Sequence, residues 1–307
     1  MNLKCFVLLI SVAAMAGCSR LSPARHTLQE SPTTGTVAIA KSPTAPPTEI
    51  DDYSRTRSLE RAALRMMAKG TTVPIQTLIT QLDRRECRLA LSPTNVSHKL
   101  TAAEIYQQFK PSVLLVSGVY KCPRCGRYHT NTASGFFITA TGAFVTGYHV
   151  VNNKTNNTMV AMTDGGKVFP VKEVLAASRD DDVAILRVDG GGTGFQPVAL
   201  STDAPVGSPV YVISHPNGRF YTFTDGLVSR YYTQTSDGKA VSMMAITADF
   251  ARGSSGAPVF NEYGAVVSFV ASTMSVYYHG EEGKKDDLQM VFKQCVPARS
   301  VLKLIKH

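Results

Sequence analysis

Several features are scarce or missing in this chain of 307 residues. The apolar run near its start, Cys5 to Ala16, is too short to cross a bilayer as a retained helix. The net charge is +9, but the basic residues are scattered, and Arg84-Arg85 and Lys284-Lys285 are the longest basic runs. Neither run is interleaved with aromatic residues. This distribution argues against nucleic-acid binding.

A Gly-x-Ser-x-Gly motif followed by a late histidine is also missing. After Ser255, the only histidines are His279 and His307. This argues against an α/β-hydrolase, in which the catalytic serine precedes both its acidic partner and its histidine.

The first residues instead predict export. A short basic region, Met1 to Lys4, precedes the apolar run, and residues 1–17 are interpreted as a secretory signal peptide. Residues 15–18, Met-Ala-Gly-Cys, resemble a bacterial lipobox, which would make Cys18 the lipidated mature N-terminus. Simple cleavage near Ala16 is the alternative. We expect secretion across the bacterial inner membrane, with a lipid anchor on Cys18 at the outer membrane facing the periplasm, or an extracellular protein.

Between this segment and the main domain, the composition changes twice. Residues 18–50 are rich in Ser, Thr, Pro and Ala without apolar periodicity, which predicts a disordered tether. Helical spacing of apolar residues from Arg57 to Lys69, and again after Pro74, predicts two short helices. We therefore expect residues 51–100 to form a helical N-terminal extension, whose role the sequence does not indicate.

A capping box opens the next element. Thr101 and Glu104 have the spacing of this motif and predict a third helix, which Pro111 ends ahead of the first strand.

Three short motifs carry the candidate chemistry. Ser255 lies in a Gly-rich turn, residues 253–258, as an activated nucleophile would. His149 follows an apolar stretch that predicts two strands, at a strand-to-turn junction where it can act as general base. Asp182 directly precedes the apolar run 183–188 and can orient the imidazole without taking its proton.

Taken singly, each motif has a structural explanation: a flexible turn, a structural histidine or a strand cap. The chain order His149, Asp182, Ser255 joins them, because it matches the order in chymotrypsin-like proteases and not that in subtilisins. We interpret the three as a catalytic triad. Asp180 and Asp181, which precede Asp182, are expected to face solvent.

Beyond the triad, residues 101–307 resemble the trypsin-like protease domain of the HtrA (Deg) family. The resemblance includes Ser134-Gly135-Phe136-Phe137-Ile138, the segment around His215-Pro216, and the C-terminal residues 289–305. It implies a mainly β fold, a chymotrypsin-like double six-stranded antiparallel β-barrel, with the short helical N-terminal extension and a C-terminal helix. PDZ domains usually follow in the family, and we expect none here because the chain ends at His307.

The resemblance also implies an oxyanion hole from the backbone N–H groups of Gly253 and Ser255. Where the family usually has Gly-Asn-Ser-Gly-Gly, this chain has Ser254 and Ala257, both small. Ser254 replaces the aspartate that pairs with a freed N-terminus in chymotrypsins, which argues against that kind of zymogen activation. Ser268 matches a serine that in many trypsin-like enzymes bonds the catalytic carboxylate, and a plain strand serine is the alternative.

Substrate preference receives conflicting indications. Counted from Ser255, Asp249 stands where trypsins place the carboxylate that attracts Lys or Arg. Val270 stands where trypsins have a glycine on the pocket wall, and a branched side chain there favours Ala, Val or Ser. Because HtrA relatives usually prefer small aliphatic residues, we favour that preference.

Apart from Cys5 and Cys18, the chain has Cys87, Cys122, Cys125 and Cys295. The expected oxidising compartment favours disulfides, and half a zinc knuckle at Cys122-Pro-Arg-Cys125, with His129 nearby, is the alternative.

The sequence thus predicts a serine endopeptidase that acts on protein or peptide substrates of the envelope or exterior, with no cofactor and no metal. A catalytically inactive, membrane-anchored binding module of the same fold is the alternative.

Overall fold

The computed structural model describes residues 49–93, 97–236, 238–281 and 284–306. They belong to one compact unit that begins at Glu49. The predicted signal peptide, the lipidation site Cys18 and all but the last two residues of the predicted tether lie outside the described residues. No helix in the described part of the chain is both long enough and apolar enough to span a membrane.

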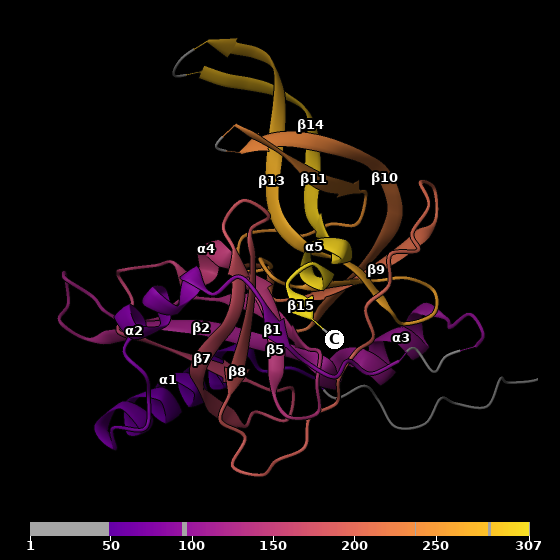
Figure 1. Ribbon diagram of the computed structural model, residues 1–307. Helices are drawn as coiled ribbons and strands as arrows, with labels where there is room; N and C mark the ends of the chain where they lie inside the picture. Colours follow the sequence, from indigo (N-terminus) through magenta and orange to yellow (C-terminus); the bar gives the residue numbers. More distant parts are fainter. Residues whose placement is uncertain (1–48, 94–96, 237, 282–283, 307) are drawn as a thin grey trace, which may run out of the picture. The chain divides into compact units, whose positions relative to one another are not determined.

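Within these residues, six antiparallel strands form a first ring, which closes where Leu115 pairs with Met162. In ring order they are β2 (Val113–Lys121), β4 (Ala133–Phe137), β5 (Ala143–Gly147), β8 (Val183–Val188), β7 (Val168–Ser178) and β6 (Thr158–Met162). A short strand, β3 (Tyr128–Thr130), pairs with the outer end of β2 as a hairpin. Figure 1 shows strands β2, β5, β7 and β8 of this ring in the lower half of the view.

Most residues of these strands are buried, and alternate residues enter two separate clusters. On β2, Val113 and Leu115 join the cluster that reaches the second barrel, whereas Leu114 and Val116 join the cluster beneath the N-terminal residues. This explains the long apolar stretch of β2, whose two faces are both buried along most of its length, whereas β7 carries the exposed Lys172.

The second ring is a closed barrel, and six strands form it in the described chain. In ring order they are β9 (Pro209–Ser214), β10 (Thr222–Ser236), β11 (Lys239–Ile246), β14 (Lys284–Pro297), β13 (Val266–Glu281) and β12 (Pro258–Phe260). With the first ring, this confirms the predicted mainly β double barrel. The 3₁₀ turn η3 (Pro216–Gly218) follows β9.

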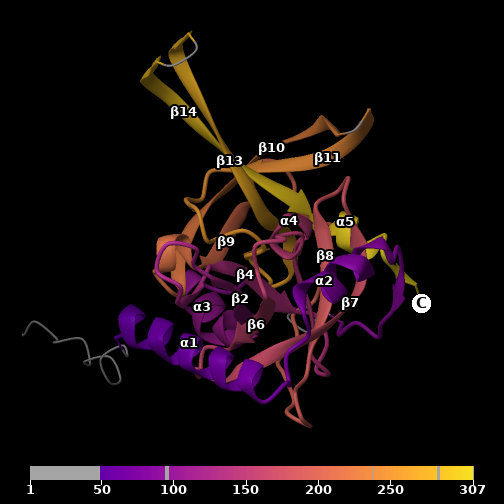
Figure 2. The ribbon, with the colours of Figure 1, turned by 90° about the vertical axis from the view of Figure 1, so that its left-hand side faces the viewer.

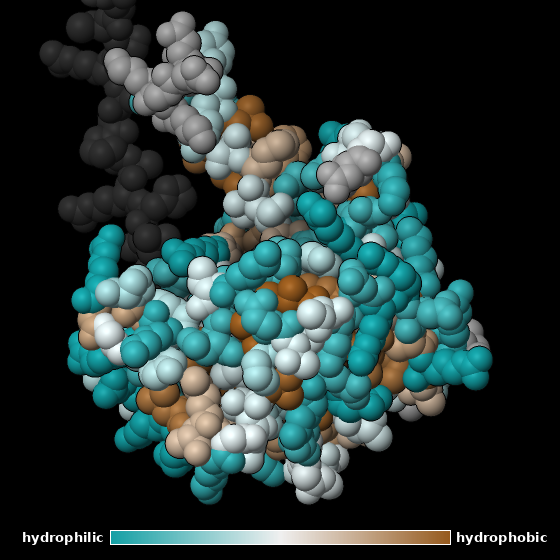
Figure 3. Space-filling model, turned by 60° about the vertical axis from the view of Figure 1, so that its left-hand side comes forward, coloured by the Kyte–Doolittle hydropathy of each residue, from teal (hydrophilic) through white to brown (hydrophobic). Residues whose placement is uncertain are grey.

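Strands β13 and β14 continue beyond the barrel as a two-stranded arm, which both ribbon views show projecting from the body (Figure 2). Met274 pairs with Phe292 and Val276 with Met290, and several of these apolar side chains are exposed. Figure 3 shows hydrophobic side chains on this arm. The sequence analysis did not predict the arm.

The N-terminal residues are integrated with the barrels. Helix α1 (Asp52–Ala68) begins five residues before the predicted start, where the Asp51 side chain accepts the Ser54 N–H. Helix α2 (Ile75–Thr80) and the 3₁₀ turn η1 (Gln81–Asp83) pack apolar side chains into the first barrel's outer cluster. Strand β1 (Cys87–Arg88) pairs in parallel with β15 (Ile305–Lys306), close to the C-terminus.

The predicted capping box is present. Helix α3 (Ala102–Phe109) starts where Thr101 donates its N–H to the Glu104 carboxylate and its hydroxyl accepts the Glu104 N–H. Turn η2 (Lys110–Ser112), which contains Pro111, then leads into β2. The predicted C-terminal helix is also present but short, as α5 (Ala298–Leu302), because β14 extends to Pro297.

Candidate active site

His149 lies where β5 leaves the first barrel. It is the second residue of the short helix α4 (Tyr148–Val151), and its side chain is 49% exposed. Gly147 makes room for the ring: a Cβ there would lie 2.9 Å from His149 Cε1 and 3.5 Å from Asp182 Oδ2. A side chain at position 147 would therefore displace the imidazole.

Asp182 lies in the turn between β7 and β8, facing His149. Its Oδ2 is 2.8 Å and its Oδ1 3.0 Å from His149 Nδ1, and Oδ1 also accepts the His149 backbone N–H. The Asp182 carbonyl accepts the Tyr148 N–H, and the residue has a positive φ of 53°. The carboxylate is thereby held against Nδ1, which leaves Nε2 as the nitrogen able to take a proton from a nucleophile.

The electrostatics of this pair favour a protonated ring. Partial burial lowers the pKa of His149, but the hydrogen bond and negative charge of Asp182 outweigh it and raise the pKa above 6.5. Asp182 therefore stabilises the imidazolium that a general base becomes after accepting a proton.

Ser255 lies in the turn between β11 and β12. Its hydroxyl donates to the Ala271 carbonyl, 3.3 Å away, and no hydrogen bond joins it to His149 within the described chain. Ala271 lines the same cavity as His149 and Asp182. His149 and Asp182 thus line one cavity, and Ser255 makes a hydrogen bond to a residue that lines it, but no hydrogen bond links Ser255 to His149 in the described chain.

Two glycines shape the turn that carries Ser255. Gly253 has φ +100°, and a Cβ there would lie 2.5 Å from the His215 carbonyl oxygen. Gly256 has φ +86°, and a Cβ there would lie 2.2 Å from the Ser134 carbonyl oxygen. Both the backbone angle and the lack of space therefore require glycine at these positions.

Serines from two other strands hold this turn. From β4, the Ser134 hydroxyl donates to the Gly253 carbonyl at 3.1 Å, and its N–H donates to the Ser255 carbonyl at 2.8 Å. From β9, the Ser214 hydroxyl accepts a hydrogen bond from the buried Ser254 hydroxyl at 3.0 Å. Sequence analysis missed the roles of Ser134 and Ser214. Their only signal was a small polar residue within an otherwise apolar strand.

The first of the two predicted oxyanion-hole donors is oriented from outside the turn. The Asn217 N–H donates to the Arg252 carbonyl at 2.6 Å. Because carbonyl and N–H point in opposite directions in a trans peptide, the Gly253 N–H points away from Asn217. Within the described residues, neither this N–H nor that of Ser255 has a hydrogen-bond acceptor. Both remain available to a ligand.

The segment that supplies Asn217 is itself fixed. His215 is fully buried, and its Nδ1 accepts the Tyr221 N–H at 3.0 Å. Burial lowers the pKa of His215 to about 3, so it stays neutral at ordinary pH. It supports the turn and offers no proton transfer to solvent.

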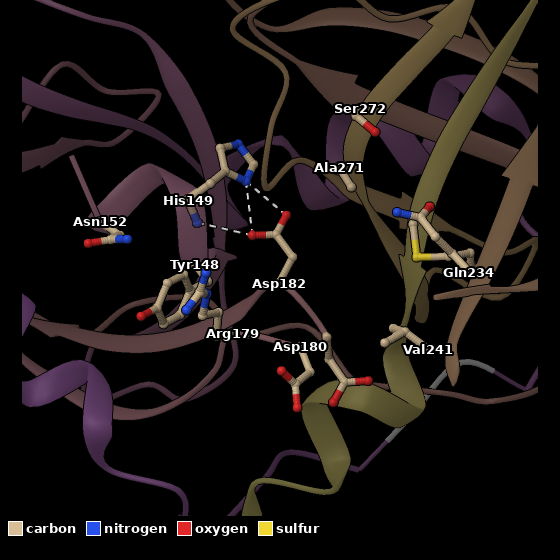
Figure 4. A pocket seen from close by; sticks show the side chains of 12 residues that line it. Tyr148, His149, Asn152, Arg179, Asp180, Asp182, Gln234, Val241, Ala271 and Ser272 are labelled. Atoms are coloured by element: carbon tan, nitrogen blue, oxygen red, sulfur yellow. Dashed lines mark hydrogen bonds and ion pairs between the residues drawn. The ribbon is translucent and has the colours of Figure 1, made fainter. Parts of the chain in front are cut away.

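A cavity of about 380 Å³ lies beside the His149–Asp182 pair. Figure 4 shows this pair on one side, with Ala271 and Ser272 of β13 across from it. Val241 and Met243 of β11 contribute further apolar surface.

The specificity residues inferred by counting are not brought together. Asp249 is 85% exposed, forms an ion pair with Lys293 at 3.1 Å and lines a different cavity. This corrects its assignment to the pocket: the carboxylate is paired with a cation of its own chain.

Val270 and Ser268 also differ from the prediction. Val270 is 1% exposed and packs in the second barrel's core with Cys295, so it does not form a pocket wall. Ser268 is fully buried on the same strand and makes no hydrogen bond with Asp182. Neighbouring Ala271 and Ser272 line the cavity instead, at a register shift that interrupts the regular alternation of β13 between Val270 and Ser272.

Asp180 and Asp181, which precede Asp182, were expected to face solvent. In the structure both carboxylates have partners within the chain. Asp180 forms an ion pair with Lys239, whose hydrogen bond lowers the pKa of Asp180. Asp181 accepts hydrogen bonds from the hydroxyls of Ser178 and Ser300. These contacts connect the loop that carries Asp182 to the second barrel and to α5.

The expected disulfides are absent from the described chain, where Cys87, Cys122, Cys125 and Cys295 are free thiols. Cys295 is buried in the second barrel, whereas Cys122 and Cys125 lie together at the β2–β3 turn. The fold separates the cysteines into different regions.

Comparisons with known proteins agree with this architecture. Residues 133–268, which include the three predicted triad residues, match the family model of the trypsin-like peptidase domain. The structure resembles the crystal structure of Deg5, with a TM-score of 0.51 and 22% identity over 66% of this chain and 90% of that one. It also resembles the active form of the Rv3671c protease from M. tuberculosis, with a TM-score of 0.51 and 21% identity over 70% and 90%.

Sequence relatives are similar over part of their length. The chloroplastic Protease Do-like 5 of Arabidopsis thaliana is 29% identical over 47% of this chain and 49% of its own. A probable periplasmic serine endoprotease, DegP-like, of Rhizobium meliloti is 35% identical over 46% and 28%. The chain spans less than half the length of these curated relatives. Residues 133–268 are thus similar to the trypsin-like peptidase domain, the fold is a chymotrypsin-like double barrel, and several of the relatives are named as Do-like or DegP-like proteases.

Proposed function

We propose that this protein is a serine endopeptidase that forms an acyl-enzyme on Ser255. The observation that carries the proposal is the His149–Asp182 pair, in which both carboxylate oxygens contact the imidazole. This pair lines a cavity together with Ala271, whose carbonyl accepts a hydrogen bond from the Ser255 hydroxyl. All of these residues except Ala271 lie in the segment that matches the trypsin-like peptidase domain.

In the proposed reaction, the Ser255 hydroxyl turns from the Ala271 carbonyl toward His149 Nε2. Catalytic hydrogen bonds are often unformed without substrate and tighten when it binds. Ser255 Oγ then attacks the substrate carbonyl carbon while His149 takes its proton. The imidazolium, stabilised by Asp182, returns that proton to the leaving amine as the peptide bond breaks. Water attacks the ester by the same route and restores Ser255.

The tetrahedral intermediate carries a negative oxygen, and the N–H groups of Gly253 and Ser255 would bind it. Both donors are unused within the described chain, and the Asn217–Arg252 hydrogen bond orients the first. Each such donor contributes about 100- to 1,000-fold to turnover.

For the substrate, we propose small or aliphatic residues before the scissile bond. Asp249 lines a different cavity from the His149–Asp182 pair and forms an ion pair with Lys293, so its carboxylate is not placed to attract Lys or Arg beside that pair. Val241, Met243 and Ala271 give the cavity an apolar surface. A panel of fluorogenic peptides tests this: we expect cleavage after Val or Ala, whereas strong cleavage after Arg with none after Val would contradict it.

For the location, we propose the bacterial envelope or exterior, with a lipid on Cys18. The lipobox-like residues 15–18 support it, as do relatives described as periplasmic. Mass spectrometry of the N-terminal peptide should find acylated Cys18. A Cys18→Ala variant should be released from membranes, and equal membrane retention of the variant and the parent protein would contradict the anchor.

Labelling with a fluorophosphonate tests the enzymatic proposal directly. The parent protein should be modified once, Ser255→Ala should not be modified, and the matched control Ser275→Ala, an exposed serine of the arm, should label normally. Peptide cleavage should follow the same pattern.

A second candidate is an inactive binding module of the same fold. One observation favours it: the Ser255 hydroxyl donates its hydrogen bond to the Ala271 carbonyl and not to His149. Absence of both labelling and cleavage in a folded parent protein would support the module and refute the peptidase.

A further inference from the structure

Three residues with metal-binding side chains gather at the β2–β3 turn, away from the proposed triad. The ligand atoms of Cys122, Cys125 and His129 all lie within 4.8 Å of one another. Cys125 Sγ is 3.1 Å from His129 Nε2. The three residues lie within eight positions of the chain, so the hairpin itself assembles the cluster.

The backbone turn sets the two thiols beside the histidine. The Cys122 N–H donates to the Arg127 carbonyl at 2.8 Å, and the Gly126 N–H donates to the Cys122 carbonyl at 2.9 Å. Gly126 takes the left-handed conformation, with φ +69°. The β2–β3 pairing then aligns Tyr120 with His129 and fixes where the imidazole stands.

The spacing suits a tetrahedral ion. With zinc–ligand bonds of about 2.0–2.3 Å, neighbouring ligand atoms of a tetrahedral site lie roughly 3.3–3.8 Å apart. The observed cluster, with one contact at 3.1 Å and all others within 4.8 Å, reaches this arrangement with small side-chain movements. Two thiolates and a neutral imidazole also neutralise a divalent charge and are ligands that zinc prefers.

We propose that Cys122, Cys125 and His129 bind one zinc ion at the tip of the β2–β3 hairpin. The described part of the chain contributes three ligands to this cluster, which leaves the fourth coordination position to a water molecule or another ligand. This replaces the expectation that the protein binds no metal and that these cysteines form disulfides.

The position in the fold indicates what the ion does. Asn131 follows the hairpin: its carbonyl accepts the Ser117 hydroxyl, and its side chain accepts the Gly118 N–H at 2.7 Å. This anchor lies between the proposed zinc site and Ser134, which holds the nucleophile turn. The ion therefore stabilises the outer hairpin. Its removal should lower the melting temperature of the protein clearly and should change turnover at the proposed active site little.

Metal analysis of the full chain, purified under reducing conditions and dialysed after zinc addition, tests the proposal. We expect about one zinc per chain, lost in Cys122→Ser and in Cys125→Ser. Cys87→Ser is the matched control, because this half-buried thiol lies on β1 outside the cluster, and it should retain the zinc. Absence of zinc from the parent protein would overturn the proposal. Peptide mapping that finds a Cys122–Cys125 disulfide in the protein isolated without reductant would also overturn it.

Cobalt provides a second measurement that does not depend on the stability of the variants. Added to the parent protein, Co²⁺ should produce thiolate-to-metal charge-transfer absorption and the intense visible bands of tetrahedral coordination, and zinc should abolish both. A spectrum without the charge-transfer band would exclude thiolate ligation. Zinc should raise the melting temperature of the parent protein and a chelator should lower it, and an unchanged melting temperature would contradict the stabilising role.

Discussion

The two barrels contribute to the candidate active site in different ways. The first barrel provides two side chains, His149 and Asp182, which are joined by a direct hydrogen bond at adjacent strand ends. The second provides a turn whose backbone shape matters as much as Ser255, and this turn is held by Ser134 of the first barrel and Ser214 of its own. Chemical identity is therefore decisive in the first barrel and conformation in the second. Substitutions should separate the two.

The largest effect is expected from Asp182→Asn. Asparagine tolerates the positive φ of this position, so the fold should remain intact. An amide cannot stabilise the imidazolium or hold the same tautomer, and kcat should fall by about 10⁴-fold. Peptide cleavage measures it. Asp180→Asn, which breaks only the pair with Lys239, should leave activity nearly unchanged. Equal losses in both variants would contradict the orienting role of Asp182.

Gly253→Ala should affect conformation and chemistry together. The new Cβ would lie 2.5 Å from the His215 carbonyl, so the turn must shift and the oxyanion donor must move. We expect kcat to fall about 100- to 1,000-fold, with about 1–3 kcal/mol lost from the free energy of unfolding. Kinetics and urea denaturation measure the two effects.

Gly207→Ala is the control for the backbone angle. Gly207 also has a positive φ, +90°, but nothing lies within 4 Å of a Cβ there. Gly207→Ala should therefore lower the free energy of unfolding without lowering activity. If it lost as much activity as Gly253→Ala, the loss in Gly253→Ala could not be attributed to the oxyanion hole.

Ser134→Ala should weaken the link between the barrels. The buried Gly253 carbonyl would lose its hydroxyl donor, at a cost of about 1–3 kcal/mol in the free energy of unfolding. Activity should fall less than in Gly253→Ala, because the bond from the Ser134 N–H to Ser255 remains. Ser112→Ala is the matched control: this hydroxyl is buried without a hydrogen-bond partner in the described chain, so its removal should be nearly neutral. Equal stability of the two variants would refute the predicted role of the bond.

The smallest effect is a pH shift. His149 must be neutral to accept a proton, and Asp182 raises its pKa, so kcat/KM should fall as the pH drops through a midpoint above 6.5. In Asp182→Asn, the midpoint of the residual activity should move to lower pH. The contribution of the pair to stability has the opposite trend: it is complete below the unfolded pKa of about 6.5 and is lost as the pH rises through the raised folded pKa. An identical midpoint in both proteins would show that Asp182 does not set the pKa of His149.

Much of the local structure could be predicted, because it depends on residues close in the sequence. The capping box of Thr101 and Glu104, the strand before His149 and the turn containing Ser255 were all identified from short patterns. The pairing of Asp249 with Lys293 could not be predicted from short patterns. It arises because the second barrel places β14 beside the end of β11, far from it in the sequence. Counting residues from Ser255 also failed at Val270. A register shift between Val270 and Ser272 changes which residues oppose each other.

The sequence by itself determined the order and type of the proposed catalytic residues, because they lie in short local motifs, and its resemblance to the HtrA family predicted the fold class. Only the tertiary structure decided which residues face the cavity and which groups hold the nucleophile turn. It also decided that Cys122 and Cys125 lie with His129 and apart from the other thiols. The reason is physical: Ser134 and Gly253 are 119 residues apart, and such hydrogen bonds exist only once both barrels have closed.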